Sequence, residues 1–513
     1  MKKTVKTDVF KVVLTVTVIF AVSRLVVLSS ILCIRGSELS PNAYSYKRVA
    51  AYASVTIPGV VDKLYITADT QQGSSTINIV ANGKALGSMK LTPKTDIFIF
   101  DMNGLAKKQE NKLEFISADR ARGWRVWEIR TDHNIYNDIL KLNNSNFVQD
   151  MQAVGFSGSV VRRPGDALEE LLLGMSKWDA NIYAGIAEKG YSYTSNDAEM
   201  YNVVFPYLFP LAIFAVKALL GCSAIAAGII VNNLAVLLSA ILLYYVTSYT
   251  MNMKFLSYIP VILLLFNPYA YFLTSSFSEG LFILLLLCSV LMLYKDKYME
   301  YALFAGALSG IRMVGVVSVP VLLYQYFIVK RNKPGALNVL KAFLLSVISV
   351  WGLISYMIYQ KVKFGDFLAA VKNQKAWTPG SISPSYLAQQ LNWFLHKMGD
   401  YTDPRVLAGY IIVIITGFCI FYYLDNRSKI TDRERLLLFI TLSMLAVPLV
   451  FYSKIPYIHN SMGRYTLPAF PIYILMCRYI NRNTLVFLLL LIALSTFLMV
   501  IMTMRAALGF IPN

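Results

Sequence analysis

The sequence predicts a polytopic α-helical membrane protein with an inserted β-sandwich domain outside the membrane. Hydrophobic residues make up 56% of the 513 residues and charged residues only 15%, against roughly 45–50% and about 25% in soluble domains. Many apolar stretches also reach the roughly 20 residues that a helix needs to cross a bilayer core about 30 Å thick. These two observations exclude a simple soluble protein.

Apolar stretches of the required length occur at about eleven places. Lipid offers no hydrogen-bond partners to the backbone, so a segment that crosses the membrane must pair its own N–H and C=O groups. We therefore expect each stretch to be a membrane-spanning helix. Residues 1–34 form the first of them, and residues 201–513 form a multi-span membrane domain with an outer loop at 361–404. The expected spans are 9–34, 203–220, 223–247, 256–274, 277–294, 300–329, 336–360, 405–424, 436–453, 464–481 and 484–505.

Basic residues near the start of the chain predict the orientation of the protein in the membrane. Lys2, Lys3, Lys6 and Lys11 precede the first span, and short basic loops lie on the cytoplasmic side of membrane proteins. We therefore expect a cytoplasmic N-terminus and an integral protein of a bacterial plasma membrane. A cleaved signal peptide is the alternative, but the apolar stretch is too long for one and Arg24 interrupts it.

The formal net charge of +19 is largely a topology signal. Alternation of the spans places basic loops such as 330–333 and 425–435 on the cytoplasmic side. Because the basic residues mark loop ends and form no continuous stripe, we expect no nucleic-acid partner. One stretch stays open. Alternation places 275–279 inside and 295–297 outside, whereas a re-entrant pair around Arg312 reverses both.

The segment between the first two spans has the composition of a soluble domain, and we expect it on the outer face. Within residues 35–140, short β-favouring runs alternate with turn signals, a spacing that predicts a small antiparallel β-sandwich. Two roles stay open: a spacer or folding module, or a glycan-holding module with Trp124, Trp127 and Tyr65 as stacking platforms. The β-favouring runs are 52–57, 63–68, 76–81, 97–101, 112–117 and 126–131.

Residues 141–200 form a first-loop segment that includes a candidate base. The pattern at 166–176 predicts an amphipathic helix, either on the outer membrane surface or packed within the outer domain. Trp178 and Asp179 follow it directly. A carboxylate at a membrane boundary suits a general base that takes a proton from a hydroxyl group. A helix cap or loop residue is the alternative for Asp179.

Ionisable residues inside the predicted spans are further candidates, because each costs about 2.5–3.5 kcal/mol on insertion scales. Arg24, Glu279 and Arg312 qualify. A structural ion pair between Arg312 and Glu279 is the alternative to a functional role. A second set lies near outer span ends, where converging cations suit a phosphate carried by a lipid. For Lys454 in that set the alternative is snorkelling to solvent. This set is Lys454, His459 and Arg464.

Other motifs are informative mainly by their absence. In the outer loop, apolar residues near helical spacing before Trp377 predict an interfacial helix. The sequence has no HExxH, Walker or GxSxG motif and only three His residues, so a zinc site, a hydrolase and an ATP-driven pump are not expected. The five Cys residues are scattered without paired spacing, so they imply neither a disulfide framework nor a metal site.

Taken in order, these segments resemble the PIG-V type of integral-membrane mannosyltransferases, which belong to the GT-C superfamily of glycosyltransferases. The resemblance covers about residues 1–34 and 170–480. Single motifs are weak, but their ordered combination is specific. The matching residues are Arg24, Trp178-Asp179, Tyr183, Ile186-Ala187, Gly190-Tyr191, Phe205-Pro206, Pro210, Asn267-Pro268, Ser275–Phe282, Arg312, Gly365-Asp366, Gln374, Trp377, Arg464, Pro468 and Phe470-Pro471.

The resemblance implies transfer of a sugar, typically mannose, from a polyprenyl-phosphate donor in the membrane to an extracytoplasmic glycan or glycolipid acceptor, with inversion at the anomeric carbon. Asp179 would act as the base, while Arg312 and Arg464, or Lys454 in place of one, would stabilise the departing lipid phosphate. No cofactor and no metal are expected. The residues expected to contact substrate are Trp178, Tyr183, Glu279, Gln374 and His459.

The sequence also departs from the family pattern. In the family, the Trp-Asp motif follows the first span much sooner, so the β-sandwich is an insertion whose role is not carried over. Gly280 and Ala180 stand where other residues are commoner, but neither change touches Asp179. A transporter or flippase of lipid-linked sugars or polar solutes is the main alternative function, although the two halves of the chain show no convincing repeat. A receptor or scaffold that uses the β-sandwich is a third class.

Overall fold

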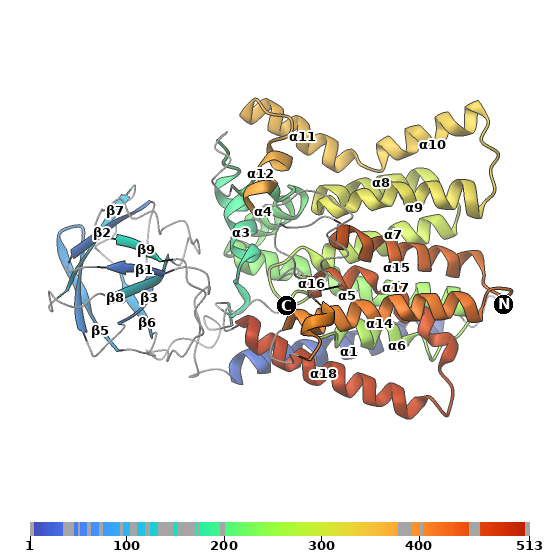
Figure 1. The fold of residues 1–513 in the computed structure, drawn as a ribbon, viewed down its shortest axis with the longest axis horizontal. Coiled ribbons are helices and arrows are strands. Elements are labelled where there is room, and N and C mark those ends of the chain that lie inside the picture. The colour runs from blue at the N-terminus through green and yellow to red at the C-terminus, as the bar shows by residue number, and fades with distance from the viewer. Residues whose placement is uncertain are drawn as a thin grey trace. The chain divides into compact units, whose positions relative to one another are not determined.

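A computed structural model gives the fold of the chain (Figure 1). The chain divides into two compact units, which we describe separately. The helical unit comprises residues 1–27, 186–502 and 511–513, and the sheet unit comprises residues 28–185 and 503–510. The residues that the structure describes are 5–33, 46–49, 52–58, 63–70, 75–92, 96–102, 110–117, 124–131, 147–150, 171–172, 174–194, 201–377, 392, 394–399, 404–450 and 462–507.

The helical unit consists of α-helices that lie side by side along one direction (Figure 1). Two helices, α1 (Val5–Cys33) and α18 (Leu485–Ala507), begin in this unit and end in the sheet unit. The other helices of the unit are α4 (Leu208–Leu220), α5 (Ala224–Met251), α6 (Tyr258–Leu265), α7 (Glu279–Tyr294), α8 (Tyr298–Ile311), α9 (Ser318–Leu323), α10 (Ala336–Ile348), α11 (Trp351–Phe364), α12 (Ala369–Trp377), α14 (Pro404–Asp425), α15 (Asp432–Val450), α16 (Met462–Tyr465) and α17 (Pro471–Met476).

Within the described residues, four helices are long and apolar enough to cross a membrane, and a fifth span results if the bent pair α10 and α11 counts as one. The four are α1, α5, α14 and α18, and each coincides with a predicted span. Large apolar side chains cover the outside of α18, where Phe487 is 70% exposed and Phe497 is 61% exposed. Water would disfavour such a surface, whereas lipid accommodates it. The prediction of a helical membrane protein is therefore confirmed.

The predicted count of about eleven spans is not confirmed, because several predicted spans are interrupted. The predicted span 256–274 is helical only as far as Leu265. The predicted span 300–329 changes at Arg312, which is extended, and continues as a 3₁₀ turn, α9 and a π-helix. Proline contributes to these breaks, because it lacks a backbone N–H and clashes with the preceding turn. Pro268 lies just beyond α6, and Pro320 lies within α9.

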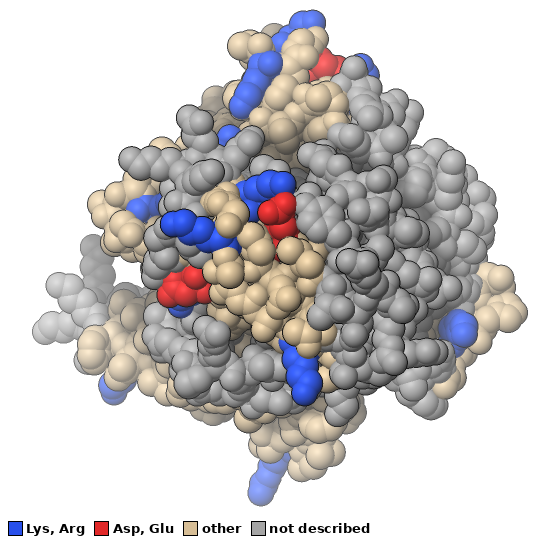
Figure 2. Space-filling model, turned by 90° about the vertical axis from the view of Figure 1, so that its left-hand side faces the viewer, with Lys and Arg blue, Asp and Glu red and all other residues tan. Residues whose placement is uncertain are grey.

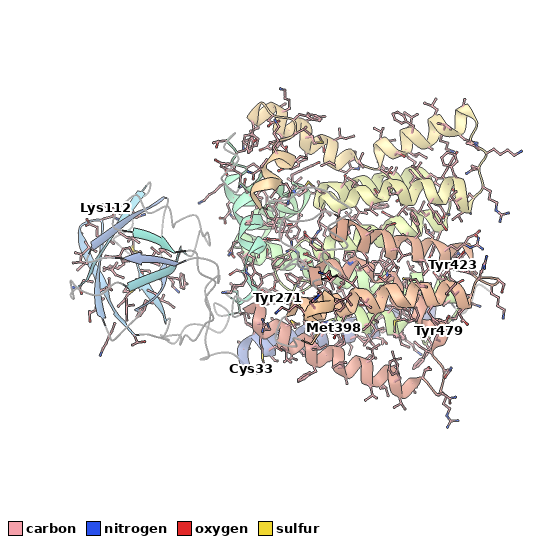
Figure 3. The ribbon with its side chains drawn as sticks, viewed as in Figure 1. Cys33, Lys112, Tyr271, Met398, Tyr423 and Tyr479 are labelled. Carbon is pink, nitrogen blue, oxygen red and sulfur yellow. The ribbon has the colours of Figure 1, made fainter. Side chains whose placement is uncertain are left out.

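One end of the helical unit collects the basic turns, and we call it the basic end. Lys330 contacts Asp296 at 2.8 Å, which joins the turn after α7 to the turn after the π-helix. Arg433, at the start of α15, donates to the carbonyl of Tyr249 near the end of α5 at 3.0 Å. The N-terminus lies at the same end (Figure 1). Figure 3 shows Tyr423 and Tyr479 there, and Tyr271 in the interior of the unit.

The predicted span 436–453 coincides with one regular helix as far as the described residues reach, whereas the predicted span 464–481 does not. The first begins in α15, where Thr431 and Glu434 form a capping box: the Thr431 N–H donates to Glu434 Oε2 at 2.7 Å, and the Glu434 N–H donates to Thr431 Oγ1 at 3.3 Å. Such reciprocal bonds satisfy two of the free N–H groups of a helix start. The second is a series of short helical turns, α16 and α17 with 3₁₀ turns between and after them.

The sheet unit contains two antiparallel sheets, with strand orders β6-β3-β8-β1-β9 and β2-β7-β4-β5. Every predicted β-favouring run coincides with a strand, while β1, β5 and β9 were not predicted. The strands are β1 (Tyr46–Val49), β2 (Tyr52–Pro58), β3 (Lys63–Thr70), β4 (Ser75–Ala81), β5 (Lys84–Leu91), β6 (Asp96–Asp101), β7 (Glu110–Ser117), β8 (Trp124–Thr131) and β9 (Phe147–Asp150).

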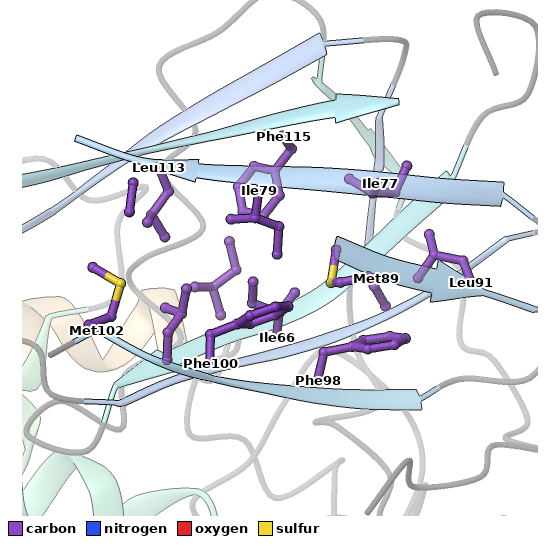
Figure 4. Close-up of a cluster of buried hydrophobic side chains, with 14 residues drawn as sticks. Ile66, Ile77, Ile79, Met89, Leu91, Phe98, Phe100, Met102, Leu113 and Phe115 are labelled. Atoms are coloured by element: carbon purple, nitrogen blue, oxygen red, sulfur yellow. The ribbon is translucent and has the colours of Figure 1, made fainter. Parts of the chain in front are cut away.

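Side chains from both sheets share one buried core (Figure 4). Alternate residues of a strand point to the same face, and Ile77 and Ile79 of β4 accordingly lie in the core with Phe98 and Phe100 of β6. Tyr65 is only 4% exposed. The prediction that Tyr65 offers a surface for stacking a sugar is therefore wrong, because its ring lies inside the unit. The side chains of Trp124 and Trp127 lie outside the described residues.

The described basic side chains form no continuous stripe on the face drawn in Figure 2. The Lys and Arg residues that are described there stand singly or in small groups, some beside acidic residues.

Candidate functional site

The helical hairpin of α7 and α8 brings two charged residues together at its open end. Glu279 is the first residue of α7 and Arg312 directly follows α8. The guanidinium of Arg312 pairs with Glu279 Oε1. The turn of the hairpin, residues 295–297, belongs to the basic end. At about 1.5 Å per residue, the length of α7 places the ion pair about 20 Å from that end.

A second arginine joins this ion pair from a distant part of the chain. Arg464 of α16 lies with its Nε 3.6 Å from the same carboxylate oxygen, Glu279 Oε1. The side chain of Glu279 is 1% exposed, whereas those of Arg312 and Arg464 are 11% and 12% exposed. The sequence predicted all three residues as candidates, and the structure brings them together. We call these three residues the arginine cluster.

Aromatic rings surround the arginine cluster. The Arg312 guanidinium lies 5.0 Å from the centre of the Tyr465 ring, and the Arg464 guanidinium lies 5.5 Å from the same ring and 5.7 Å from that of Phe272. Cations are attracted to the faces of such rings. Among the described residues, the two guanidinium groups and the one carboxylate of the cluster sum to one net positive charge. The arrangement therefore suits an anionic ligand.

The second oxygen of the Glu279 carboxylate, Oε2, is buried and has no hydrogen-bond partner among the described residues. A buried carboxylate oxygen without a donor is costly. The oxygen is thus chemically suited to accept a hydrogen bond from a ligand hydroxyl group. No group of three or more His, Cys, Asp or Glu residues within the described part of the chain could hold a metal ion.

The Trp-Asp motif forms a tight turn in the sheet unit. Asp179 is the first residue of α3 (Asp179–Lys189), and its side chain is half-buried. Trp178 has a φ of +48°, a conformation that costs a non-glycine residue about 1–3 kcal/mol and occurs preferentially at functional sites. The Asn181 N–H closes the turn on the Trp178 carbonyl at 3.1 Å. Tyr183, another predicted site residue, is buried at 4% exposure.

The residues just before this turn pack closely within the sheet unit. A Cβ atom on Gly174 would lie 2.6 Å from Cγ2 of Ile31, near the end of α1, and 3.6 Å from Cβ of Ala507, at the end of α18. A larger residue at this position would therefore require the Ile31 side chain to move. Of the amphipathic helix predicted at 166–176, residues 171, 172, 174 and 175 are helical and the others lie outside the described residues or beyond the helix.

The predicted interfacial helix is present as α12, at the end of the helical unit opposite the basic end (Figure 1). Asp366, just before α12, accepts from Lys372 at 2.8 Å, and this bond holds the pKa of Asp366 below its usual value. Asn373 accepts from the Tyr201 N–H at 2.9 Å. Gln374 is half-buried in the same helix, and the side chain of Trp377 lies outside the described residues.

A belt of aromatic residues accompanies α12 at this end of the helical unit. The Tyr191 ring centre lies 5.3 Å from that of Tyr356 and 5.7 Å from that of Tyr359, and Tyr193 packs edge-on against Phe364. Tyrosines concentrate where a membrane meets water. The belt therefore indicates that this end lies at a membrane surface.

Two predicted cations, Lys454 and His459, lie outside the described residues. Arg24 is described, but it bonds to groups outside the arginine cluster: it donates to the Leu273 carbonyl at 2.6 Å and to Asn233 Oδ1 at 3.3 Å. Sequence reasoning missed Asn232 and Asn233, which are adjacent polar residues in the apolar helix α5. Paired amides inside a predicted span are a signal that could have found them, because unpartnered amides are expensive in lipid.

Fold and site together define a helical membrane protein with a buried cluster of two arginines and a glutamate that suits an anionic ligand. The model of the Mannosyltransferase (PIG-V) family matches residues 137–444, and the chain belongs to this family. The family expected from the sequence is therefore confirmed. The match includes Asp179, Glu279 and Arg312, whereas strands β1 to β8 lie outside it.

Curated relatives have related sequences over part of their length. The chain is 28% identical to the GPI alpha-1,6-mannosyltransferase 2 of Rattus norvegicus over 228 residues, which cover 40% of this chain and 44% of the relative. It is 30% identical to the GPI alpha-1,6-mannosyltransferase 2 of Homo sapiens over 167 residues, which cover 31% of this chain and 33% of the relative. The chain thus spans less than half the length of these relatives.

Solved structures share a remote likeness. The structure of ArnT from Cupriavidus metallidurans bound to undecaprenyl phosphate matches with a TM-score of 0.43 and 12% sequence identity, over 63% of this chain and 58% of that chain. The oligosaccharyltransferase of Archaeoglobus fulgidus, in a complex with zinc and sulfate, matches with a TM-score of 0.37 and 13% identity, over 67% of this chain and 49% of that chain.

Proposed function

We propose that the protein is a glycosyltransferase that moves a sugar, typically mannose, from a polyprenyl-phosphate donor to a hydroxyl group of an extracytoplasmic glycan or glycolipid. Membership of the mannosyltransferase family supports the class of reaction. The observation that carries the choice of donor is the arginine cluster, because its net positive charge lies in the membrane-embedded unit, where a lipid phosphate can reach it.

The arginine cluster supplies the charge that the departing group requires. As the bond between the anomeric carbon and the phosphate oxygen breaks, negative charge develops on the polyprenyl phosphate. Arg312 and Arg464 donate charge-assisted hydrogen bonds to this phosphate and stabilise the transition state. The unpartnered Oε2 of Glu279 accepts from a hydroxyl group of the sugar. Because two guanidinium groups provide the positive charge, the reaction proceeds without a metal ion or other cofactor.

Asp179 acts on the acceptor. The acceptor oxygen forms the new bond to the anomeric carbon from the side opposite the phosphate, so the configuration inverts, and its proton passes to the Asp179 carboxylate. The strained backbone at Trp178 supports a functional role for this turn, because strain of this kind persists where surrounding structure holds it. Trp178, Tyr183, Gln374 and His459 complete the proposed contacts with donor and acceptor.

The charge distribution supports an extracytoplasmic reaction. Basic turns lie on the cytoplasmic side of membrane proteins, so we infer that the basic end is cytoplasmic. The arginine cluster, about 20 Å away along α7, then lies toward the outer surface. In this proposed orientation residues 295–297 face the cytoplasm and Glu279 lies on the outer side, which is the alternative that a re-entrant pair around Arg312 would give.

The proposed function is tested by replacing the base. Purified protein in lipid nanodiscs is supplied with labelled polyprenyl-phosphate mannose and a glycolipid acceptor. We expect Asp179→Asn to lower kcat at least about 100-fold, because general-base catalysis contributes roughly 10²–10⁴-fold, and to leave the donor KM near that of the wild type. Asp296→Asn is the control, since Asp296 pairs with Lys330 at the basic end. Chelation with EDTA should not change the rate.

The same preparation distinguishes the main alternative. A transporter or flippase would move lipid-linked sugar or a polar solute across proteoliposomes without forming a glycosidic bond, and the bent pair α10 and α11 is the kind of broken helix that transporters contain. Movement of the substrate across the proteoliposome membrane without sugar transfer would show that the protein is a transporter and not a glycosyltransferase. Full transfer by a folded Asp179→Asn protein would instead remove Asp179 as the base and leave the reaction class intact.

A further inference from the structure

An irregular stretch of backbone leads to the arginine cluster. Between α6 and α7, residues 267–278 form turns rather than a continuous helix. Most of these residues are buried, and Tyr269 and Tyr271 are completely so. Backbone carbonyls at membrane depth have no water to bond, so irregular backbone persists there only if the protein supplies partners.

Three side chains from α1 and α5 provide these partners to four consecutive carbonyl groups. The donors are Arg24, Asn232 and Asn233, and we call them the carbonyl clamp. Their bonds are Asn232 Nδ2 to the carbonyls of Phe272 at 2.8 Å and Ser275 at 2.7 Å, Arg24 Nη1 to that of Leu273 at 2.6 Å, and Asn233 Nδ2 to that of Thr274 at 2.6 Å. Arg24 also donates to Asn233 Oδ1 at 3.3 Å.

Asn232 holds the chain on both sides of Glu279. Its Nδ2 group binds the Ser275 carbonyl, four residues before Glu279, and its Oδ1 accepts from the Gly280 N–H at 2.8 Å. An amide has two N–H donors and a carbonyl acceptor, and Asn232 uses both donors and the acceptor oxygen on this one segment. Asn232 is completely buried.

Gly280 permits this close approach. A Cβ atom at Gly280 would clash with Asn232 Oδ1 and would lie 2.7 Å from the Asn232 carbonyl oxygen. A larger residue at this position would push α7 away from α5 and lengthen the bond from the Gly280 N–H. Gly280, which departs from the family pattern, is thus the residue that makes room for Asn232.

We propose that Asn232 is a positioning residue for the arginine cluster: by binding the backbone at Ser275 and Gly280, it fixes Glu279 where its carboxylate meets Arg312 and Arg464. The inference rests on the proposed function for the role of the cluster in donor binding. Packing alone does not require an amide here, because an apolar side chain would fill the same space and leave three backbone groups without partners. A displacement of about 1 Å in a catalytic site can cost about 100-fold in rate.

The first test needs no substrate. Hydrogen exchange of the amides in residues 272–282 is measured by mass spectrometry for full-length protein in nanodiscs. We expect Asn232→Ala to accelerate exchange in this segment at least about 10-fold, because a buried hydrogen-bonding group loses its partner. Asn232→Asp is the second variant, which keeps an acceptor for the Gly280 N–H and removes the donors to the carbonyls of Phe272 and Ser275. Thr247→Val is the matched control: Thr247 is also completely buried on α5, and its hydroxyl bonds only within that helix, to Leu243.

The second test separates a positioning role from a purely structural one. We expect both Asn232 variants to raise the donor KM, and the dissociation constant for polyprenyl phosphate alone, at least about 10-fold, with the acceptor KM unchanged. A residue that only stabilises the fold would reduce the active fraction and leave both KM values unchanged.

The outcomes are distinct. Wild-type exchange rates in 272–282 for both variants would overturn the proposal, and so would faster exchange with unaltered donor binding. If the wild-type protein neither transfers sugar nor binds polyprenyl phosphate, the proposed function fails, and the exchange rates then decide alone whether Asn232 holds the segment around Glu279.

Discussion

The carboxylate of Glu279 determines how the two arginines of the cluster differ. Arg312 pairs directly with Oε1, while Arg464 Nε lies 3.6 Å from the same atom. Removal of one partner of a buried ion pair leaves the other charge uncompensated, at a cost of about 3–5 kcal/mol. Loss of Arg312 therefore threatens the fold, whereas loss of Arg464 leaves the Glu279 to Arg312 pair in place. The two arginines are expected to have different mutational effects.

Arg464→Ala should raise the donor KM about 10-fold or more, because a charge-assisted hydrogen bond to the phosphate is lost, with little change in thermal unfolding. Arg312→Ala should lower the free energy of unfolding by about 3–5 kcal/mol, and adding Glu279→Gln should restore much of it by removing the stranded charge. Unfolding midpoints in detergent and donor KM values measure both effects. Equal destabilisation by the two alanine variants would show that the pairing is not as described.

At the scale of whole elements, the close crossing of α8 and α11 determines the position of Arg312. Gly306, Gly310 and Gly352 line this crossing, and a Cβ atom on Gly352 would lie 2.5 Å from the Gly306 carbonyl and 2.6 Å from the Gly310 nitrogen. Small residues allow helices to approach this closely in membranes. Ser309 Oγ also accepts from the Leu353 N–H at 3.0 Å, which satisfies a free donor at the start of α11.

Gly352→Ala should destabilise the helical unit by about 1–3 kcal/mol, because the atoms in its way belong to the backbone of α8 and cannot rotate aside. The donor KM should rise as well, since Arg312 ends the displaced helix. Gly335→Ala is the control, because nothing lies within 4 Å of a Cβ atom at that position. Thermal unfolding of the two variants gives the comparison. A Gly352→Ala protein as stable as the control would contradict the close crossing.

Elements that form because of their own local sequence pattern were predictable. Elements that depend on contacts with residues far away in the sequence were not. The spans α1, α5, α14 and α18 are long, uninterrupted apolar stretches, and the runs that became β3 and β4 alternate locally. Residues 267–274 of the irregular segment were predicted as the end of the span 256–274, because the strongly apolar run before them dominates the hydropathy of that stretch. The carbonyls of the segment are satisfied from Arg24 and Asn232, which no local pattern connects to it.

The same limit applies to the candidate site at the scale of the whole molecule. Glu279 and Arg312 were identified as candidates because an ionisable residue inside a membrane span is costly. Arg464 was identified because it belongs to a set of basic residues near the outer ends of spans. Their grouping around one carboxylate depends on helices that are distant in the sequence, since Arg464 follows Glu279 by more than one hundred residues. The two ends of the helical unit were likewise only partly foreseen: the basic loops predicted one of them, but only the ion pair of Lys330 with Asp296 shows that residues 295–297 lie at the same end as Lys330.

The two ends of the helical unit also make its orientation measurable. Ser192 lies exposed beside the aromatic belt, and Lys333 lies exposed at the basic end. In a protein with Cys33 replaced by Ser, since Cys33 is exposed, we expect Ser192→Cys to react with a membrane-impermeant maleimide in intact cells. Lys333→Cys should react only after permeabilisation, because basic turns are retained in the cytoplasm. The reverse pattern would place the arginine cluster on the inner side and would exclude an extracytoplasmic acceptor.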